Sequence, residues 1–406
     1  MLISVIYNVT DTFFVGQLHN RSMIAAIGVV FSFVSVIQAI GFWYGYGSGN
    51  AMSKKIGAKD YAEAEIISSI GIVIAIVTGI VIAIAAYIFV VPLAKLIGGS
   101  ASQDVLTFTV QYLKIIIISI PFSLYAVTVY NQLRLCGNVR DGMIGLLSGM
   151  LSNMVLDPLL MFPLNMGFIG AGYATLIGQI IGCIVLTALA QSRGNIPISI
   201  KKAHYSKARV YHILAGGLPN FSRQAITGAA LVLLNVTAAQ YGESMIAALT
   251  ISSKIVAVAF MIMIGWGQGF QPICAMNYGA QQYERVKKAF ITTVAVGTLF
   301  LTVASIILYI FAEHWMQLMS TDEDVVSIGI KILRMQCFSL PLLGAFAVSS
   351  MFMQNIGNYF SALLISISRQ GFFYVPLLYF LPAVYGKTGI YLLQPVSDFL
   401  VLCSND

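Results

Sequence analysis

The 406-residue chain has 58% hydrophobic and only 9% charged side chains, whereas soluble domains carry about 45–50% and about 25%. This composition excludes an ordinary soluble protein and a largely disordered chain. The formal net charge of +7 raises the question of a nucleic-acid partner, but such proteins gather Lys and Arg on one soluble face, and here the bases lie in short loops. We therefore expect a membrane protein that binds no nucleic acid.

Apolar runs, separated by Gly, Pro and charged residues, follow one another along the whole chain. All but the first and last are long enough to cross about 30 Å of hydrocarbon as helices, and a helix satisfies its own backbone hydrogen bonds in lipid. The sequence therefore predicts an all-α polytopic fold of about twelve transmembrane helices. In chain order, the runs cover residues 2–14, 25–52, 66–91, 105–133, 143–163, 169–190, 213–240, 245–274, 290–311, 325–353, 360–381 and 389–403.

Lys and Arg gather in alternate loops between these runs, a bias that marks the cytoplasmic side of a membrane protein. The most basic of these loops covers residues 193–212. We expect it to be a cytoplasmic linker between an N-terminal lobe, residues 1–192, and a C-terminal lobe, residues 213–406. An even number of helices places both termini in the cytoplasm.

The two predicted lobes repeat each other in sequence. Residues 22–26, Ser-Met-Ile-Ala-Ala, return as residues 244–248, an offset of 222. Because each copy has six predicted helices, the copies are related by an axis along the membrane normal, which is an architecture of transporters. In this repeat Asn8 corresponds to Asn235, but fewer residues of its half precede Asn8 than precede Asn235. We therefore expect that the sequence lacks part of the first helix. The last run is also shorter than its counterpart in the first half, so we expect that the end of the last helix is missing too.

Ionisable residues within predicted spans are functional candidates, because charge is costly in lipid. Three carboxylates qualify: Asp11, Asp157 and Asp398. Asn153 and Asp157 are four residues apart and share one helical face, and their oxygens are ligands that a small cation prefers. If Asp11 and Asp157 converge, they need a cation or a shared proton. The alternatives are an interfacial cap at Asp11 and a structural Asp-Pro bend at Asp157.

Other candidates indicate structure rather than chemistry. Asp398 and Arg369 lie on neighbouring predicted spans, where a structural ion pair is the favoured interpretation. We found no P-loop and no hydrolase motif, so we expect no enzyme and no cofactor, and we expect energy to come from a gradient of Na⁺ or H⁺.

Several motifs, in order along both halves, resemble those of the multidrug and toxic compound extrusion (MATE) family, in its DinF-like and MepA-like branch. The resemblance implies an antiporter of drugs against Na⁺ or H⁺. It also implies a cation-coupling network of Asp11, Asn153, Asp157 and Thr175, to which Tyr112 is a further candidate. The motifs are Tyr7-Asn8-x-x-Asp11-x-x-Phe14-Val15-Gly16, Gly57-Ala58-Lys59, Asn153-x-x-Leu156-Asp157-Pro158, Gly167-x-x-Gly170-Ala171-x-x-Ala174-Thr175, Gln271-Pro272-x-x-x-x-Asn277-Tyr278-Gly279-Ala280 and Arg369-Gln370.

The chain departs from the family's pattern in the C-terminal lobe. Some members have a cation site there with carboxylates on the seventh and tenth helices, but Thr227 stands at the first of these positions and residues 328–353 contain no acid. The resemblance therefore implies cation coupling in the N-terminal lobe.

We expect a monomeric, cation-coupled multidrug antiporter in the lipid bilayer of the plasma membrane, which exports amphipathic, often cationic small molecules by alternating access. One alternative is a flippase for a lipid-linked saccharide or peptidoglycan precursor. A flippase would need a basic cavity, for which Arg223, Lys254 and Arg369 are candidates, although the sequence shows no dense basic cluster. The other alternative is a membrane scaffold or sensor that transports nothing.

Overall fold

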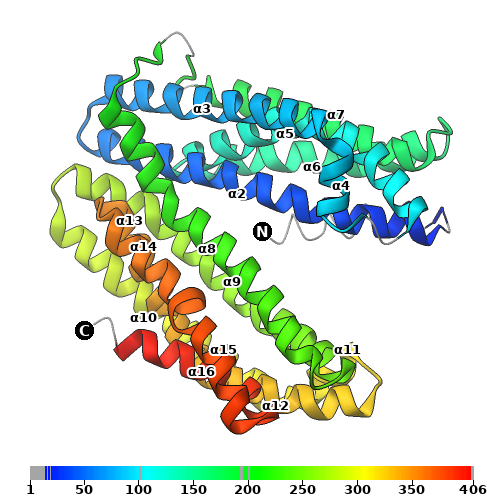
Figure 1. Cartoon of the computed structure of the whole chain (residues 1–406). Coiled ribbons are helices and arrows are strands. Elements are labelled where there is room, and N and C mark those ends of the chain that lie inside the picture. The colour runs from blue at the N-terminus through cyan, green and yellow to red at the C-terminus, as the bar shows by residue number, and fades with distance from the viewer. Residues whose placement is uncertain are drawn as a thin grey trace. The chain divides into compact units, whose positions relative to one another are not determined.

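The computed structural model describes residues 14–15, 17–18, 20–99, 102–192, 195–199 and 202–403. Within these ranges the chain forms helices joined by short connections and no β-strand (Figure 1). Contacts divide the chain into two compact units, Met1–Gly217 and Leu218–Asp406, hereafter unit 1 and unit 2.

Unit 1 consists mainly of long apolar helices. Helix α2 begins after Asn20, whose side chain accepts a hydrogen bond from the backbone N–H of Ser22, and α3 begins after Asp60, which caps Glu63 in the same way. Such caps satisfy backbone donors that a helix leaves free at its start. The helices are α2 (Arg21–Gly57), α3 (Tyr61–Ile88), α4 (Val90–Leu96), α5 (Gln103–Leu135), α6 (Val139–Met161) and α7 (Gly167–Ala190).

Helix α8 (Lys207–Ala239) leads from unit 1 into unit 2. The span predicted over residues 360–381 is divided into α14, a π-helical turn η3, and α15. The helices after α8 are α9 (Glu243–Gly279), α10 (Tyr283–Ile310), α11 (Ala312–Met319), α12 (Glu323–Ser339), α13 (Leu342–Ile356), α14 (Tyr359–Ile367), η3 (Ser368–Phe372), α15 (Tyr374–Tyr385) and α16 (Lys387–Cys403).

The sequence repeat is visible in the helix boundaries. Helices α2, α3 and α4 begin 222 residues before α9, α10 and α11, respectively. The turn that follows α2 has a positive φ of 62° at Lys59, and the turn that follows α9 has one of 59° at Gln281, again 222 residues apart. The two copies therefore share backbone geometry as well as motifs.

The two copies differ at a shared proline. Helix α5 continues through Pro121, but the second copy breaks before Pro341, and α12 and α13 meet at a bend of 52°. The span predicted over residues 325–353 is therefore a bent pair of helices that together pass as one candidate span. Proline lacks a backbone N–H and its ring crowds the preceding turn, so a helix breaks readily at that position.

Eight helices of the described part are long and apolar enough to cross a membrane, and the bent pair α12 and α13 makes a ninth candidate. Of the other three predicted spans, residues 213–240 and 389–403 are helical, in α8 and α16. The predicted span 2–14 lies outside the described residues, apart from Phe14. The all-α, polytopic class that the sequence predicts is therefore confirmed.

Candidate functional site

The predicted coupling residues Asn153, Asp157 and Thr175 lie together inside unit 1. Asn153 and Asp157 are on α6 and Thr175 is on α7, and all three are buried. Nδ2 of Asn153 donates hydrogen bonds to Oδ1 of Asp157 at 3.4 Å and to Oγ1 of Thr175 at 3.3 Å. The i, i+4 spacing read from the sequence therefore places a carboxylate and an amide side by side, and the hydroxyl of the next helix joins them.

Small residues allow α6 and α7 to approach closely at this point. Gly145 and Gly149 on α6, and Gly178 and Gly182 on α7, have the spacing of helix-packing motifs. A Cβ added to Gly178 would lie 2.8 Å from the carbonyl oxygen of Gly149 and 2.9 Å from Cβ of Asn153. The absence of a side chain at Gly178 therefore brings Asn153 against α7.

The cluster has the chemistry of a site for a small cation. Asp157 is fully buried, and Oδ1 of Asn153 is a buried oxygen that accepts no hydrogen bond from a described residue. Carboxylate, amide and hydroxyl oxygens suit a hard cation. The described residues contain no group of three or more His, Cys, Asp or Glu placed to hold a metal ion, so this site has one described carboxylate rather than an acidic cage.

The predicted network has two further members, Asp11 and Tyr112. Asp11 lies outside the described residues, so its convergence with Asp157 stays a prediction. Tyr112 on α5 is buried in unit 1, with its ring centroid 5.2 Å from that of Phe168 on α7. Its role in the network also stays a prediction.

Arg369 and Asp398 form the ion pair that the sequence indicates. Nε of Arg369 lies 2.8 Å from Oδ1 of Asp398, and the carboxylate side chain is 1% exposed. Gln394 donates to the same oxygen at 2.9 Å, and the hydroxyl of Ser397 donates to the carbonyl of Arg369 at 2.7 Å. These contacts fasten η3 to α16 within unit 2.

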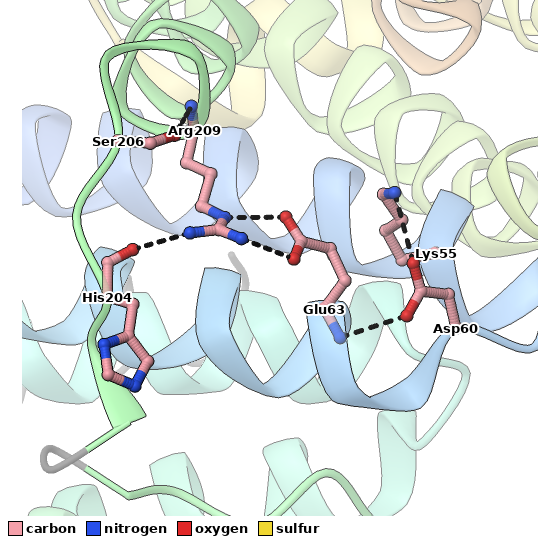
Figure 2. Close-up of polar contacts among 6 residues, drawn as sticks. All are labelled: Lys55, Asp60, Glu63, His204, Ser206 and Arg209. Atoms are coloured by element: carbon pink, nitrogen blue, oxygen red, sulfur yellow. Dashed lines mark hydrogen bonds and ion pairs between the residues drawn. The ribbon is translucent and has the colours of Figure 1, made fainter.

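The basic linker is attached to the start of α3 by ion pairs that the sequence did not indicate. Arg209 forms a fork with Glu63, in which Nε and Nη2 donate to the two carboxylate oxygens at 2.7 and 2.8 Å (Figure 2). Lys202 pairs with Glu65 at 2.8 Å. Such bidentate pairs fix orientation as well as distance, so this part of the linker is held against α3 within unit 1.

Two titrating groups in the linker have perturbed pKa values, each for its own reason. The hydrogen bond with Glu63 raises the pKa of Arg209. Burial, and then the nearby charges of Lys54 and Lys55, lower the pKa of His212. His212 is therefore most compatible with this packing when it is neutral.

Comparisons with known proteins agree with this fold. The model of the protein family described as MatE matches residues 1–159 and 222–380 of this chain. The chain is 30% identical over 390 residues to multidrug export protein MepA of Staphylococcus haemolyticus, covering 96% of this chain and 85% of that protein. It is 29% identical over 392 residues to MepA of Staphylococcus aureus strain MSSA476, covering 96% and 86%.

A crystal structure of MATE in the bent conformation superimposes with a TM-score of 0.93 at 21% identity, covering 99% of this chain and 90% of that one. The resemblance seen in the motifs and the two-lobed, all-α fold are thereby confirmed. The chain belongs to the MatE family of multi-pass membrane transporters.

Proposed function

We propose that the protein exports chemically varied amphipathic molecules by alternating access, and that entry of Na⁺ or H⁺ at Asp157 drives the export. The relatives named multidrug export protein MepA, matched over 96% of this chain, support the export of drugs. The observation that carries the coupling proposal is the contact of Asp157 with Asn153, which in turn bonds Thr175, in the buried interior of unit 1.

Burial supplies the physical reason for coupling. An ionised carboxylate away from water is costly unless it is neutralised or well bonded, so a proton or Na⁺ at Asp157 stabilises the arrangement that encloses it. A ligand shifts a conformational equilibrium only through its different affinity for the two states. We propose that the cation favours one facing state of the transporter and the cargo favours the other.

Ethidium efflux in membrane vesicles, with Na⁺ and pH gradients imposed separately, tests this function. The protein should export ethidium with at least one of these gradients. Asp157→Asn should reach the membrane but lose the gradient-dependent part of efflux, because the amide neither binds a proton nor carries charge. Asp104→Asn, which removes an exposed carboxylate at the start of α5, is the matched control. Equal gradient-driven efflux by Asp157→Asn and the control would reject the coupling site.

The cellular setting is part of the proposal. The excess of Lys and Arg in alternate loops supports a plasma-membrane protein with both termini in the cytoplasm. We further propose that one chain is the transporting unit. Accessibility of single introduced cysteines at the two ends to a membrane-impermeant thiol reagent tests the orientation, since cytoplasmic termini react only after the cells are opened.

A further inference from the structure

Unit 2 contains a cavity of about 520 Å³. Its walls come from α8, α9, α12, α13, α14, η3, α15 and α16, and every lining residue lies between Asn220 and Asp398, within unit 2. A cavity of this volume is large enough for a drug-sized organic molecule. It is separate from the coupling cluster of Asn153, Asp157 and Thr175, which belongs to unit 1.

Basic side chains outnumber acidic ones in the wall of this cavity. Arg223, Lys254 and Arg369 line it, and among the described lining residues the acidic one is Asp398, which is already paired with Arg369 at 2.8 Å. Nη2 of Arg223 donates to the amide oxygen of Asn220 at 3.3 Å. Lys254 has no ion pair or hydrogen bond with any described residue. The cavity therefore has a positive charge that the carboxylate of Asp398 does not balance.

The position of Lys254 follows from the helical repeat of α9. Thr250, Lys254, Ala257 and Phe260 recur at three- and four-residue spacing, and all four line the cavity. Side chains with this spacing share one face of a helix. Lys254 is thus placed on the face that α9 turns towards the cavity.

Apolar and aromatic side chains line the same space. Phe260, Leu343 and Phe346 are among them. The ring of Phe260 also packs against Arg369, the partner of Asp398. The guanidinium carbon of Arg369 lies 5.4 Å from the centroid of the Phe260 ring. The cavity therefore combines a surface for an apolar body with an excess of positive charge.

We propose that this cavity binds organic amphiphiles that have one anionic group beside an apolar body, and that Lys254 selects the anionic group. An ammonium group attracts an anion and repels a like charge, and Lys254, which is exposed to solvent, lines the cavity beside apolar side chains. The proposal adds organic anions to the cargo of the proposed exporter and rests on that function for its role in transport. Binding itself does not depend on coupling at Asp157.

Binding of three probes that share one ring tests the proposal: naphthoate, naphthamide and naphthylmethylammonium. Calorimetry on the full chain in a nonionic detergent should give a Kd for naphthoate about tenfold below that for naphthamide, which corresponds to about 1.4 kcal/mol, and the weakest binding for the ammonium probe. Lys254→Gln should abolish the preference for naphthoate over naphthamide. Lys254→Glu should make the ammonium probe the tightest ligand.

Lys331→Gln is the matched control, because it removes one lysine charge from an exposed position on α12 that does not line the cavity. It should keep the preference of the unmodified protein. Equal Kd values for naphthoate and naphthamide in the unmodified protein would overturn the proposal, as would a preference that persists in Lys254→Gln. The two Lys254 variants report charge selection independently, so poor folding of one leaves the other as the test.

A second experiment identifies the source of the anionic group. Naphthoate binding is compared in phosphatidylcholine nanodiscs with and without phosphatidylglycerol. Competition by phosphatidylglycerol would support the site and assign it to a lipid headgroup, whereas unchanged binding would support a soluble organic anion. Because these measurements use no ion gradient, loss of ion-driven efflux in Asp157→Asn cannot mimic a failure of the anion site.

Discussion

Gly178→Ala should loosen the packing that positions Asn153. The new Cβ would lie 2.8 Å from the carbonyl oxygen of Gly149 and 2.9 Å from Cβ of Asn153, well inside the about 3.5–4.0 Å at which carbon atoms pack best. One of these neighbours is a backbone oxygen, which cannot rotate away. Helices α6 and α7 must therefore move apart.

The cost of this movement follows from two opposing effects. Overpacking a well-packed interior costs about 1–3 kcal/mol, and replacing Gly by Ala inside a helix returns about 1 kcal/mol or less. We expect a net loss on the order of 1–2 kcal/mol. For a unit of about this size, such a loss lowers the melting temperature on the order of 5 °C.

Thermal unfolding of the purified protein in detergent measures this change. Gly265→Ala is the control, since Gly265 lies within α9 and no heavy atom comes within 4 Å of its added Cβ. We expect the control to melt at or above the temperature of the unmodified protein. If Gly178→Ala melts together with Gly265→Ala, the close approach of α6 and α7 does not hold Asn153 as we describe.

Three further predictions concern the ion pairs and His212. A double-mutant cycle of Arg209→Gln and Glu63→Gln, measured by thermal unfolding, should give a coupling energy of about 0.2–1 kcal/mol, because the pair is partly exposed; additive effects would contradict it. Because the pKa of His212 is lowered from 6.5 in the folded protein, the unfolded chain binds a proton at His212 more readily. Neutral His212 should therefore make its full contribution to the free energy of unfolding above about pH 6.5, and this contribution should fall as the pH drops below that value. Melting curves of His212→Gln across this range should depend less on pH, and an unchanged profile would count against this account. Arg369→Gln leaves a buried carboxylate unpaired and should cost about 3–5 kcal/mol; adding Asp398→Asn should restore most of the stability in the same melting assay, and no recovery would refute the pairing.

Much of the fold could be predicted from the sequence because hydrophobic runs are local patterns and the internal repeat appears when the sequence is compared with itself. The offset of 222 between residues 22–26 and 244–248 also relates the start of α2 to that of α9. The break before Pro341 could not be predicted in this way. Pro121 has an equivalent place in the first copy, yet α5 continues through it, so the outcome depends on tertiary packing rather than on the proline alone.

The candidate coupling site could be predicted in part, because the spacing of residues along one helix is a local pattern. The spacing of Asn153 and Asp157 places them on one face of α6, whatever surrounds that helix. Thr175 entered only through the family resemblance, since its contact with Asn153 depends on how α7 packs against α6. The paired motifs at Gly145 and Gly178 were a sequence signal for that packing.

The basic cavity in unit 2 could not be predicted from the sequence. Arg223, Lys254 and Arg369 lie on three separate segments, α8, α9 and η3, so no window of sequence contains a basic cluster. All three line one cavity because of how these helices pack. The lack of a dense basic run in the sequence therefore did not exclude a basic cavity.

The central claim is that export is coupled to entry of Na⁺ or H⁺ at Asp157. Movement of either cation driven by an ethidium gradient tests this claim most directly. In proteoliposomes with no imposed Na⁺ or pH gradient, an ethidium gradient should drive Na⁺ or H⁺ in the direction opposite to ethidium, because coupling between two ligands is reciprocal. The account predicts this counterflow for the unmodified protein and its loss in Asp157→Asn. Ethidium transport without counterflow of either cation, or an undiminished counterflow in Asp157→Asn, would contradict it.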